Sequence, residues 1–128
     1  MKFITVEQFQ EQPEEVQKVF LDWWKPKKLD VFVTLDRYTY LVDKYEDECI
    51  KPIYVSDMWY QKEYCIPLLT EGQLRKFIED KKGKIVEVNL FCGGYSVVTA
   101  YRKCEIYDLG KDLLQAYWKV ACQIAREG

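Results

Sequence analysis

Hydrophobic and polar residues follow the spacing of an amphipathic helix most clearly in residues 66–80, IPLLTEGQLRKFIED. Thr70 and Gln73 have the spacing of a capping box, in which each side chain satisfies a free backbone amide, so a helix should begin at Thr70. Gly83 can supply the left-handed residue that ends it. Three apolar residues share one side of this helix and need a sheet to cover: Leu74, Phe77 and Ile78.

Three further segments carry a helical pattern. Thr5 and Gln8 repeat the capping-box spacing and predict a short helix that Pro13 interrupts. A second helix should begin after Pro13 and end before Pro26. From about Lys111 the period returns and continues towards the C-terminus. The residues on the apolar face of that last helix are Leu114, Tyr117, Trp118, Ala121, Ile124 and Ala125.

The adjacent pair Trp23 and Trp24 lies where the second helix ends, with Trp24 off the main apolar stripe. We expect one of the two to close the edge of the core while its indole nitrogen donates to an acceptor.

A two-residue alternation predicts strands in the middle of the chain. Residues 29–35 are rich in β-forming residues and predict the first strand. Residues 38–42 and 53–55 predict two shorter strands, separated by an acidic turn at 43–48. The apolar face of the first strand carries Leu29, Val31, Val33 and Leu35.

A hairpin is predicted after the helix at Thr70. Residues 86–90 and 95–101 alternate, and Cys92-Gly93-Gly94 supplies the turn between them. Residues 104–107 either extend the second strand past a bulge or form a third strand. The element order indicates an α+β fold: a mainly antiparallel sheet with helices packed on one side, in a single domain over residues 1–128.

The amino-acid composition limits the class of protein that the chain can be. The chain has 128 residues, 48% of them apolar and 31% charged, which fits one globular domain. It has no histidine, the commonest general base and metal ligand, so we expect no enzyme, no metal and no cofactor. Five cysteines without CxxC spacing predict reduced, mostly buried thiols. Without a long apolar run or a secretory signal in MKFITVEQF, we expect a cytoplasmic location and no membrane partner.

Two groups of residues could carry chemistry, but a structural interpretation is favoured for each. The acidic residues of the 43–48 segment could gather around a cation, yet they lack the EF-hand pattern and suit a solvated turn. Cys92 could be a reactive thiol and Gly93-Gly94 a phosphate cradle, yet a hairpin turn explains both. An enzyme that uses Cys92 or Asp57 has no motif in its favour.

Aromatic residues concentrate between residues 38 and 64, beyond what one connecting region needs for a core. Some of these rings should be partly exposed, and tyrosine and tryptophan are favoured anchors of protein interfaces. The residues that we predict to bind a partner are Tyr38, Tyr40, Tyr45, Trp59, Tyr60 and Tyr64.

Three stretches resemble small uncharacterised proteins of phages and prophages of Gram-positive bacteria, especially clostridia. They are FLDWWKP at 20–26, CIPLLTEGQLRKFIEDK at 65–81 and LLQAYWKVACQIA at 113–125. The resemblance implies a small accessory protein in a bacterial host, where many such proteins block host machinery, including defence systems such as CRISPR. It implies no catalytic residue.

Our leading hypothesis is therefore a non-enzymatic phage protein that binds and inhibits a host protein. One alternative is a protein that sequesters a small nucleotide signal, with rings stacking on the base and Lys or Arg meeting phosphate. Another is a nucleic-acid-binding phage protein, which the balance of 19 bases against 21 acids disfavours. A homo-oligomer is left open.

Overall fold

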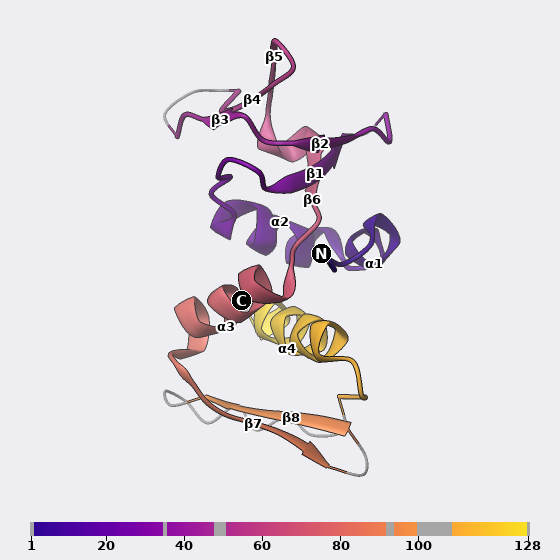
Figure 1. The fold of residues 1–128 in the computed structure, drawn as a ribbon, viewed down its shortest axis with the longest axis vertical. Helices are drawn as coiled ribbons and strands as arrows, with labels where there is room; N and C mark the ends of the chain where they lie inside the picture. The colour runs from indigo at the N-terminus through magenta and orange to yellow at the C-terminus, as the bar shows by residue number, and fades with distance from the viewer. Residues whose placement is uncertain (1, 35, 48–50, 92–93, 100–108, 128) are drawn as a thin grey trace. The chain divides into compact units, whose positions relative to one another are not determined.

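The computed structural model describes residues 2–34, 36–47, 51–91, 94–99 and 109–127 (Figure 1). Their elements fall into two compact units: unit 1 contains Met1–Ile4 and Leu69–Gly128, and unit 2 contains Thr5–Leu68. Each unit combines helices with antiparallel strands, which confirms the predicted α+β class. The strands of the described residues form three small sheets instead of one. A single domain over residues 1–128 stays a prediction.

Unit 2 begins with two helices, α1 (Val6–Gln10) and α2 (Glu14–Trp23). The predicted capping box starts α1, because the Thr5 hydroxyl accepts from the Gln8 amide at 3.1 Å and the Gln8 side chain accepts from the Thr5 amide at 3.0 Å. Trp24 follows α2 and is 2% exposed, and its indole nitrogen donates to Asp30 Oδ2 at 3.2 Å. The expectation of a tryptophan at the edge of the core with a satisfied indole is confirmed for Trp24.

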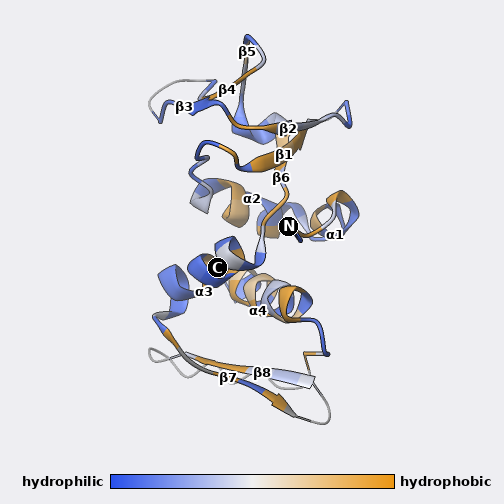
Figure 2. Ribbon diagram, viewed as in Figure 1, coloured by the Kyte–Doolittle hydropathy of each residue, from blue (hydrophilic) through white to orange (hydrophobic). Residues whose placement is uncertain are grey.

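The first sheet has the order β2-β1-β6, built from β1 (Val31–Thr34), β2 (Thr39–Leu41) and β6 (Cys65–Pro67), all antiparallel. Figure 2 shows hydrophobic residues along β1 and β6.

The predicted strand 29–35 is too long at its start. Leu29 has φ 76° and is 65% exposed, so it lies in a turn instead of on the buried face. The Asp30 side chain accepts from the Lys27 amide at 2.9 Å, and the Asp30 amide donates to the Lys27 carbonyl at 2.9 Å. These local bonds stabilise a turn in place of an extended backbone. Leu35 lies outside the described residues.

The second sheet has the order β3-β4-β5. It contains β3 (Lys44–Tyr45), β4 (Ile53–Val55) and β5 (Met58–Tyr60), and a 3₁₀ helix η1 (Lys62–Tyr64) follows. The prediction of a strand at 53–55 is confirmed. The acidic turn expected at 43–48 is wrong for residues 44–45, which pair with β4. Pairing with β4 places these two residues in the sheet. β5 was not foreseen either, although Trp59 and Tyr60 belong to residue types that favour strands.

Unit 1 contains α3 (Glu71–Lys82), α4 (Leu113–Glu127) and the hairpin of β7 (Ile85–Phe91) and β8 (Gly94–Thr99). The capping box at Thr70 and the antiparallel pairing of β7 with β8 are confirmed. Both helices lie on the same side of the hairpin (Figure 1). Gly83 caps α3 with φ 85°, although its ψ of 177° is extended and not left-handed helical. Residues 92–93 and the strand expected at 104–107 lie outside the described residues.

The helix α4 is more deeply buried than an amphipathic helix. All six residues of its predicted apolar face are buried, and so are Ala116, Val120 and Cys122 on its other sides. Since α3 packs against it and β8 contacts it, α4 forms the centre of unit 1. None of the helices in the described residues is both long and apolar enough to span a bilayer.

Gly94 sits where two backbone segments meet. Its φ is 127°, and a Cβ there would lie 2.6 Å from the Gly110 backbone nitrogen. The neighbouring Tyr95 amide donates to the Gly110 carbonyl at 2.8 Å, and Leu109 donates to Tyr95 at 3.0 Å. Close backbone packing therefore explains the glycine at position 94.

Two glycine-to-alanine changes should have opposite effects on the free energy of unfolding. Gly94→Ala should lower it by roughly 1–3 kcal/mol, because the new methyl meets rigid backbone. Gly72→Ala should raise it by up to about 1 kcal/mol, because its Cβ has room in α3 and alanine favours a helix. Urea denaturation of both variants tests this. A Gly94→Ala variant as stable as the parent would contradict the close approach to Gly110.

Candidate functional site

Three of the predicted partner-binding residues, Tyr38, Tyr40 and Tyr60, form one cluster of aromatic rings next to the buried Phe32. Phe32 in β1 is fully buried, with ring centroids 5.7 Å from Tyr40 and 6.0 Å from Tyr60. Tyr40 and Tyr60 lie 6.0 Å apart, and Tyr38 lies 6.5 Å from Tyr40. Burial, then a hydrogen bond with Tyr40, raises the pKa of Tyr60. The cluster therefore extends from the core, where Phe32 is buried, to the surface, where Tyr38 is 64% exposed.

Trp59 belongs to a second ring cluster. It pairs with Tyr54 across β4 and β5, and the two ring centroids are 4.8 Å apart. The Lys44 ammonium lies 5.6 Å from the centre of the Tyr54 ring. Neighbouring residues of a strand point to opposite faces, so Trp59 and Tyr60 face opposite sides of the β3-β4-β5 sheet. The structure therefore divides the predicted partner-binding residues Trp59 and Tyr60 between two sides of this sheet.

The turn that carries Trp59 has an unusual backbone. Ser56 and Asp57 have φ values of 49° and 63°, the pattern of a type I′ turn that normally uses Asn and Gly. Asp43 Oδ2 accepts from the Ser56 amide at 3.3 Å, and the Tyr54 hydroxyl donates to Asp57 Oδ1 at 2.8 Å. These bonds hold the short hairpin that presents Trp59.

Exposed large apolar side chains concentrate in unit 2. Among the described residues, six of the seven most exposed belong to it, and Leu90 in unit 1 is the other. The six are Leu29, Tyr38, Leu41, Met58, Trp59 and Tyr64. The expectation that some rings of the 38–64 segment are partly exposed is therefore confirmed. Their role in binding a partner stays a prediction.

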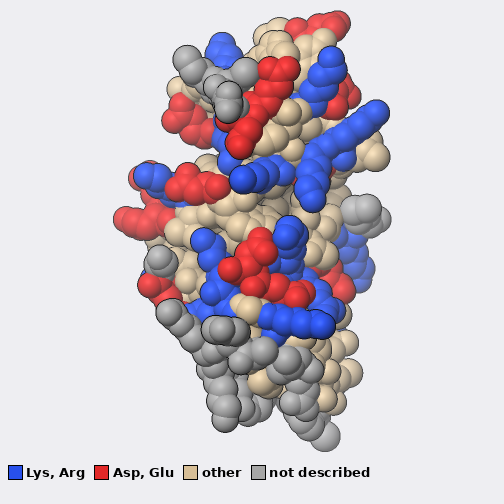
Figure 3. All heavy atoms as spheres, turned by 90° about the vertical axis from the view of Figure 1, so that its left-hand side faces the viewer, with Lys and Arg blue, Asp and Glu red and all other residues tan. Residues whose placement is uncertain are grey.

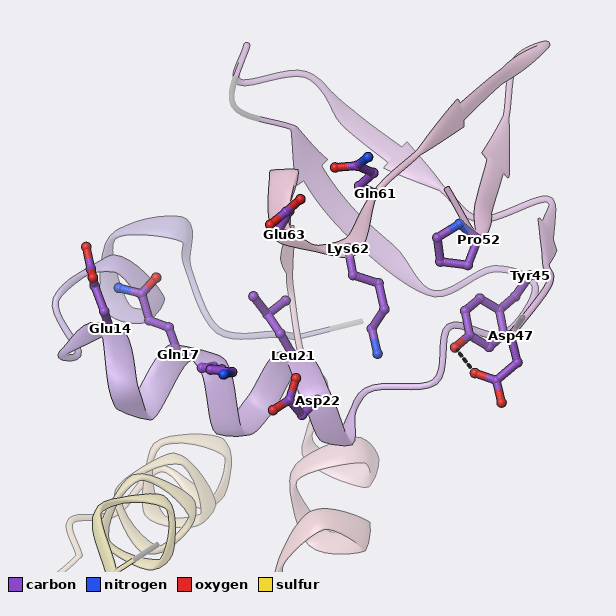
Figure 4. Close-up of a pocket in the computed structure, with 11 residues that line it drawn as sticks. Glu14, Gln17, Leu21, Asp22, Tyr45, Asp47, Pro52, Gln61, Lys62 and Glu63 are labelled. Atoms are coloured by element: carbon purple, nitrogen blue, oxygen red, sulfur yellow. Dashed lines mark hydrogen bonds between the residues drawn. The ribbon is translucent and has the colours of Figure 1, made fainter. Parts of the chain in front are cut away.

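Tyr45 lies apart from both clusters, in a groove of unit 2 with a volume of about 830 Å³. The groove is lined by one side of α2, by residues at β3 and by the chain entering η1 (Figure 4). The Tyr45 hydroxyl donates to Asp47 Oδ1 at 2.6 Å. Burial, then this bond, raises the pKa of Tyr45 to about 12. The lining residues are Glu14, Gln17, Lys18, Leu21, Asp22, Tyr45, Asp47, Pro52, Gln61, Lys62 and Glu63.

Lys62 is the side chain that extends across this groove. Figure 4 shows its ammonium between Asp22 of α2 and the Tyr45–Asp47 pair. Burial lowers the pKa of Lys62, and the charges of Asp22 and Asp47 oppose that shift. Within the described residues, its nitrogen has no ion-pair partner closer than 4.0 Å. The ammonium thus faces the two carboxylates without forming an ion pair within 4.0 Å in the described residues.

Sequence reasoning did not single out this groove. Lys18 and Asp22 lie opposite the apolar residues Val16 and Phe20 of α2, on the side of an amphipathic helix where charged residues are normally solvated. Nothing in the local pattern indicates that η1 brings Lys62 over that side of the helix, since the contact joins segments about forty residues apart.

The other candidate chemistry has a mainly structural explanation. In the acidic segment, Asp43 accepts a hydrogen bond from the Ser56 amide and Asp47 accepts one from the Tyr45 hydroxyl. The described residues contain no group of three side chains that could hold a metal ion. Cys92 and Gly93 lie outside the described residues. Figure 3 shows basic and acidic side chains interspersed over the described part of one face. That face offers no single-sign field of the kind that attracts a nucleic-acid backbone.

Comparison with protein-family models, with curated proteins and with solved structures finds no match to this chain. The resemblance to phage and prophage proteins therefore stays a prediction.

The two described cysteines, Cys65 and Cys122, are free and buried. Burial raises the pKa of each thiol to about 12, so almost no thiolate exists near neutral pH. We expect iodoacetamide at pH 8 to leave both unmodified in the folded protein and to label both in urea, as read by peptide mass spectrometry. Rapid labelling of either thiol without denaturant would contradict their burial.

Proposed function

We propose that this chain is a non-enzymatic accessory protein of the phage type that binds and inhibits a host protein, such as a component of anti-phage defence. The phage context comes from the sequence resemblance alone. The mode of action is supported by one structural observation: the most exposed large apolar side chains gather in unit 2. Exposed aromatic and methionine side chains are typical of the residues that protein interfaces use.

The geometry favours Tyr38 and Trp59 as anchors, one on each ring cluster. Tyr38 is 64% exposed and Trp59 is 38% exposed, and each ring lies near a second one: the centroid of Tyr38 is 6.5 Å from Tyr40 and that of Trp59 is 4.8 Å from Tyr54. Aromatic side chains have only two rotatable bonds, so they lose little conformational entropy on binding, which suits an interface hot spot. Because the two anchors belong to separate clusters, a partner can use one without the other.

The alternative of a nucleotide-sequestering protein would use the groove around Lys62. Four carboxylates line it, from Glu14, Asp22, Asp47 and Glu63, against the two ammonium groups of Lys18 and Lys62. The groove is large enough for a nucleotide, which favours this alternative. Its negative charges outnumber its positive ones and would repel a phosphate, which disfavours it.

Single alanine variants should separate the two anchors. If Trp59 is a hot spot, Trp59→Ala should weaken capture of a partner from lysate of a Gram-positive host by roughly thirtyfold, the effect of losing about 2 kcal/mol. Tyr38→Ala tests the other cluster in the same way. Quantitative mass spectrometry of the captured proteins, followed by a binding titration with the purified partner, gives the measurement.

Leu90→Ala is the matched control, because Leu90 is 56% exposed and lies in unit 1. It should leave capture unchanged. If both ring variants stay folded and capture as much partner as the parent, the proposed surface is wrong. If Leu90→Ala loses the partner instead, the interface belongs to unit 1.

A further inference from the structure

We propose that the groove between α2, β3 and η1 is a binding site for a neutral polyhydroxylated ligand, such as the ring of a sugar or of a ribose. The proposed anchors Tyr38 and Trp59 do not line this groove, whereas Tyr45, another of the predicted partner-binding residues, does. Its volume of about 830 Å³ lies within the range of small-molecule sites in proteins.

The polar groups of the groove select for hydroxyl groups. The Lys62 ammonium can only donate hydrogen bonds, and the carboxylates of Asp22 and Asp47 can only accept them. They face one another without closing an ion pair within 4.0 Å in the described residues (Figure 4). A hydroxyl accepts and donates at once, so it can bridge the ammonium and a carboxylate. Gln61 adds an amide group that can do both as well. The Gln17 amide nitrogen already donates to the carbonyls of Gln10 and Gln12, so Gln17 adds its side-chain oxygen as an acceptor.

Charged ligands fit the same groove less well. An anion would meet four carboxylates against two ammonium groups. A cation would meet the Lys62 ammonium, which occupies the space between Asp22 and Asp47 and would have to leave it. A neutral ligand meets neither obstacle and leaves the internal balance of charge intact.

The groove also offers apolar contacts of the kind that the C–H faces of a sugar ring use. Leu21 lies on its helical side, and Pro52 and the Tyr45 ring lie on its strand side. The Tyr45 ring is held in place because its hydroxyl is bound to Asp47 at 2.6 Å. A ring fixed in this way is prepared to pack against a ligand without further loss of freedom.

Three neutral probes test the proposal on the full chain: methyl α-D-glucopyranoside, maltotriose and adenosine. We expect at least one of them to shift the backbone amide signals of Tyr45 and Lys62 saturably in ¹⁵N-edited NMR titrations. Lys62→Met and Asp22→Asn should each weaken that binding about tenfold or more, because each removes a hydrogen bond to a charged group.

Two matched variants control for loss of charge alone. Lys28→Met and Asp36→Asn remove the same charges from exposed positions outside the groove, and they should leave the affinity unchanged. Dispersed amide spectra of all four variants verify that each one is folded.

Two charged probes supply the outcomes that overturn the proposal. If spermidine saturates these signals while no sugar does, and Lys62→Met tightens its binding, the groove is a cation site. If inorganic phosphate saturates these signals while no sugar does, and Lys62→Met abolishes phosphate binding, the groove is an anion site. No saturable shift with any neutral probe up to its solubility limit, or sugar binding that Lys62→Met and Asp22→Asn both leave unchanged, also rejects the proposal.

Discussion

The burial of Phe32 is the interaction on which the organisation of unit 2 depends. Its ring is fully buried and lies against Trp24 at the end of α2, Tyr40 of β2 and Tyr60 of β5, with centroids 5.7 to 6.4 Å apart. Removing such a ring from a core typically costs about 3–5 kcal/mol. One side chain thus joins a helix end and two separate sheets, and it supports the rings that reach the surface.

The pleat of a strand explains why the aromatic residues do not form one face. Tyr60 follows the buried side of β5 towards Phe32, and Trp59 must therefore point the other way. The two-residue turn at Ser56–Asp57 sets this register, although neither residue is a glycine. Non-glycine residues at positive φ cost of order 1 kcal/mol or more each, and hydrogen bonds from side chains offset part of that cost here. Local strain of this kind is often kept where a surface has a function.

The groove around Lys62 shows a different balance of forces. Burial makes the charged form of this amine less favourable, and its pKa falls even though two carboxylates lie near enough to oppose the shift. An ion pair with Asp22 or Asp47 would relieve that cost, but the ammonium reaches neither within 4.0 Å in the part of the chain that is described. Polar groups held apart in this way keep their capacity to bind something else.

The sequence by itself determined the elements whose signals are local. The capping boxes at Thr5 and Thr70 start helices where predicted, because both partners of each hydrogen bond lie within one helical turn. Leu29 fell outside its predicted strand, since hydrogen bonds of the neighbouring turn outweighed the alternation of side chains. Tertiary structure alone decided the candidate sites. Which side of a sheet Trp59 faces depends on cross-strand register, and whether Lys62 meets α2 depends on a contact between distant segments that no local pattern encodes.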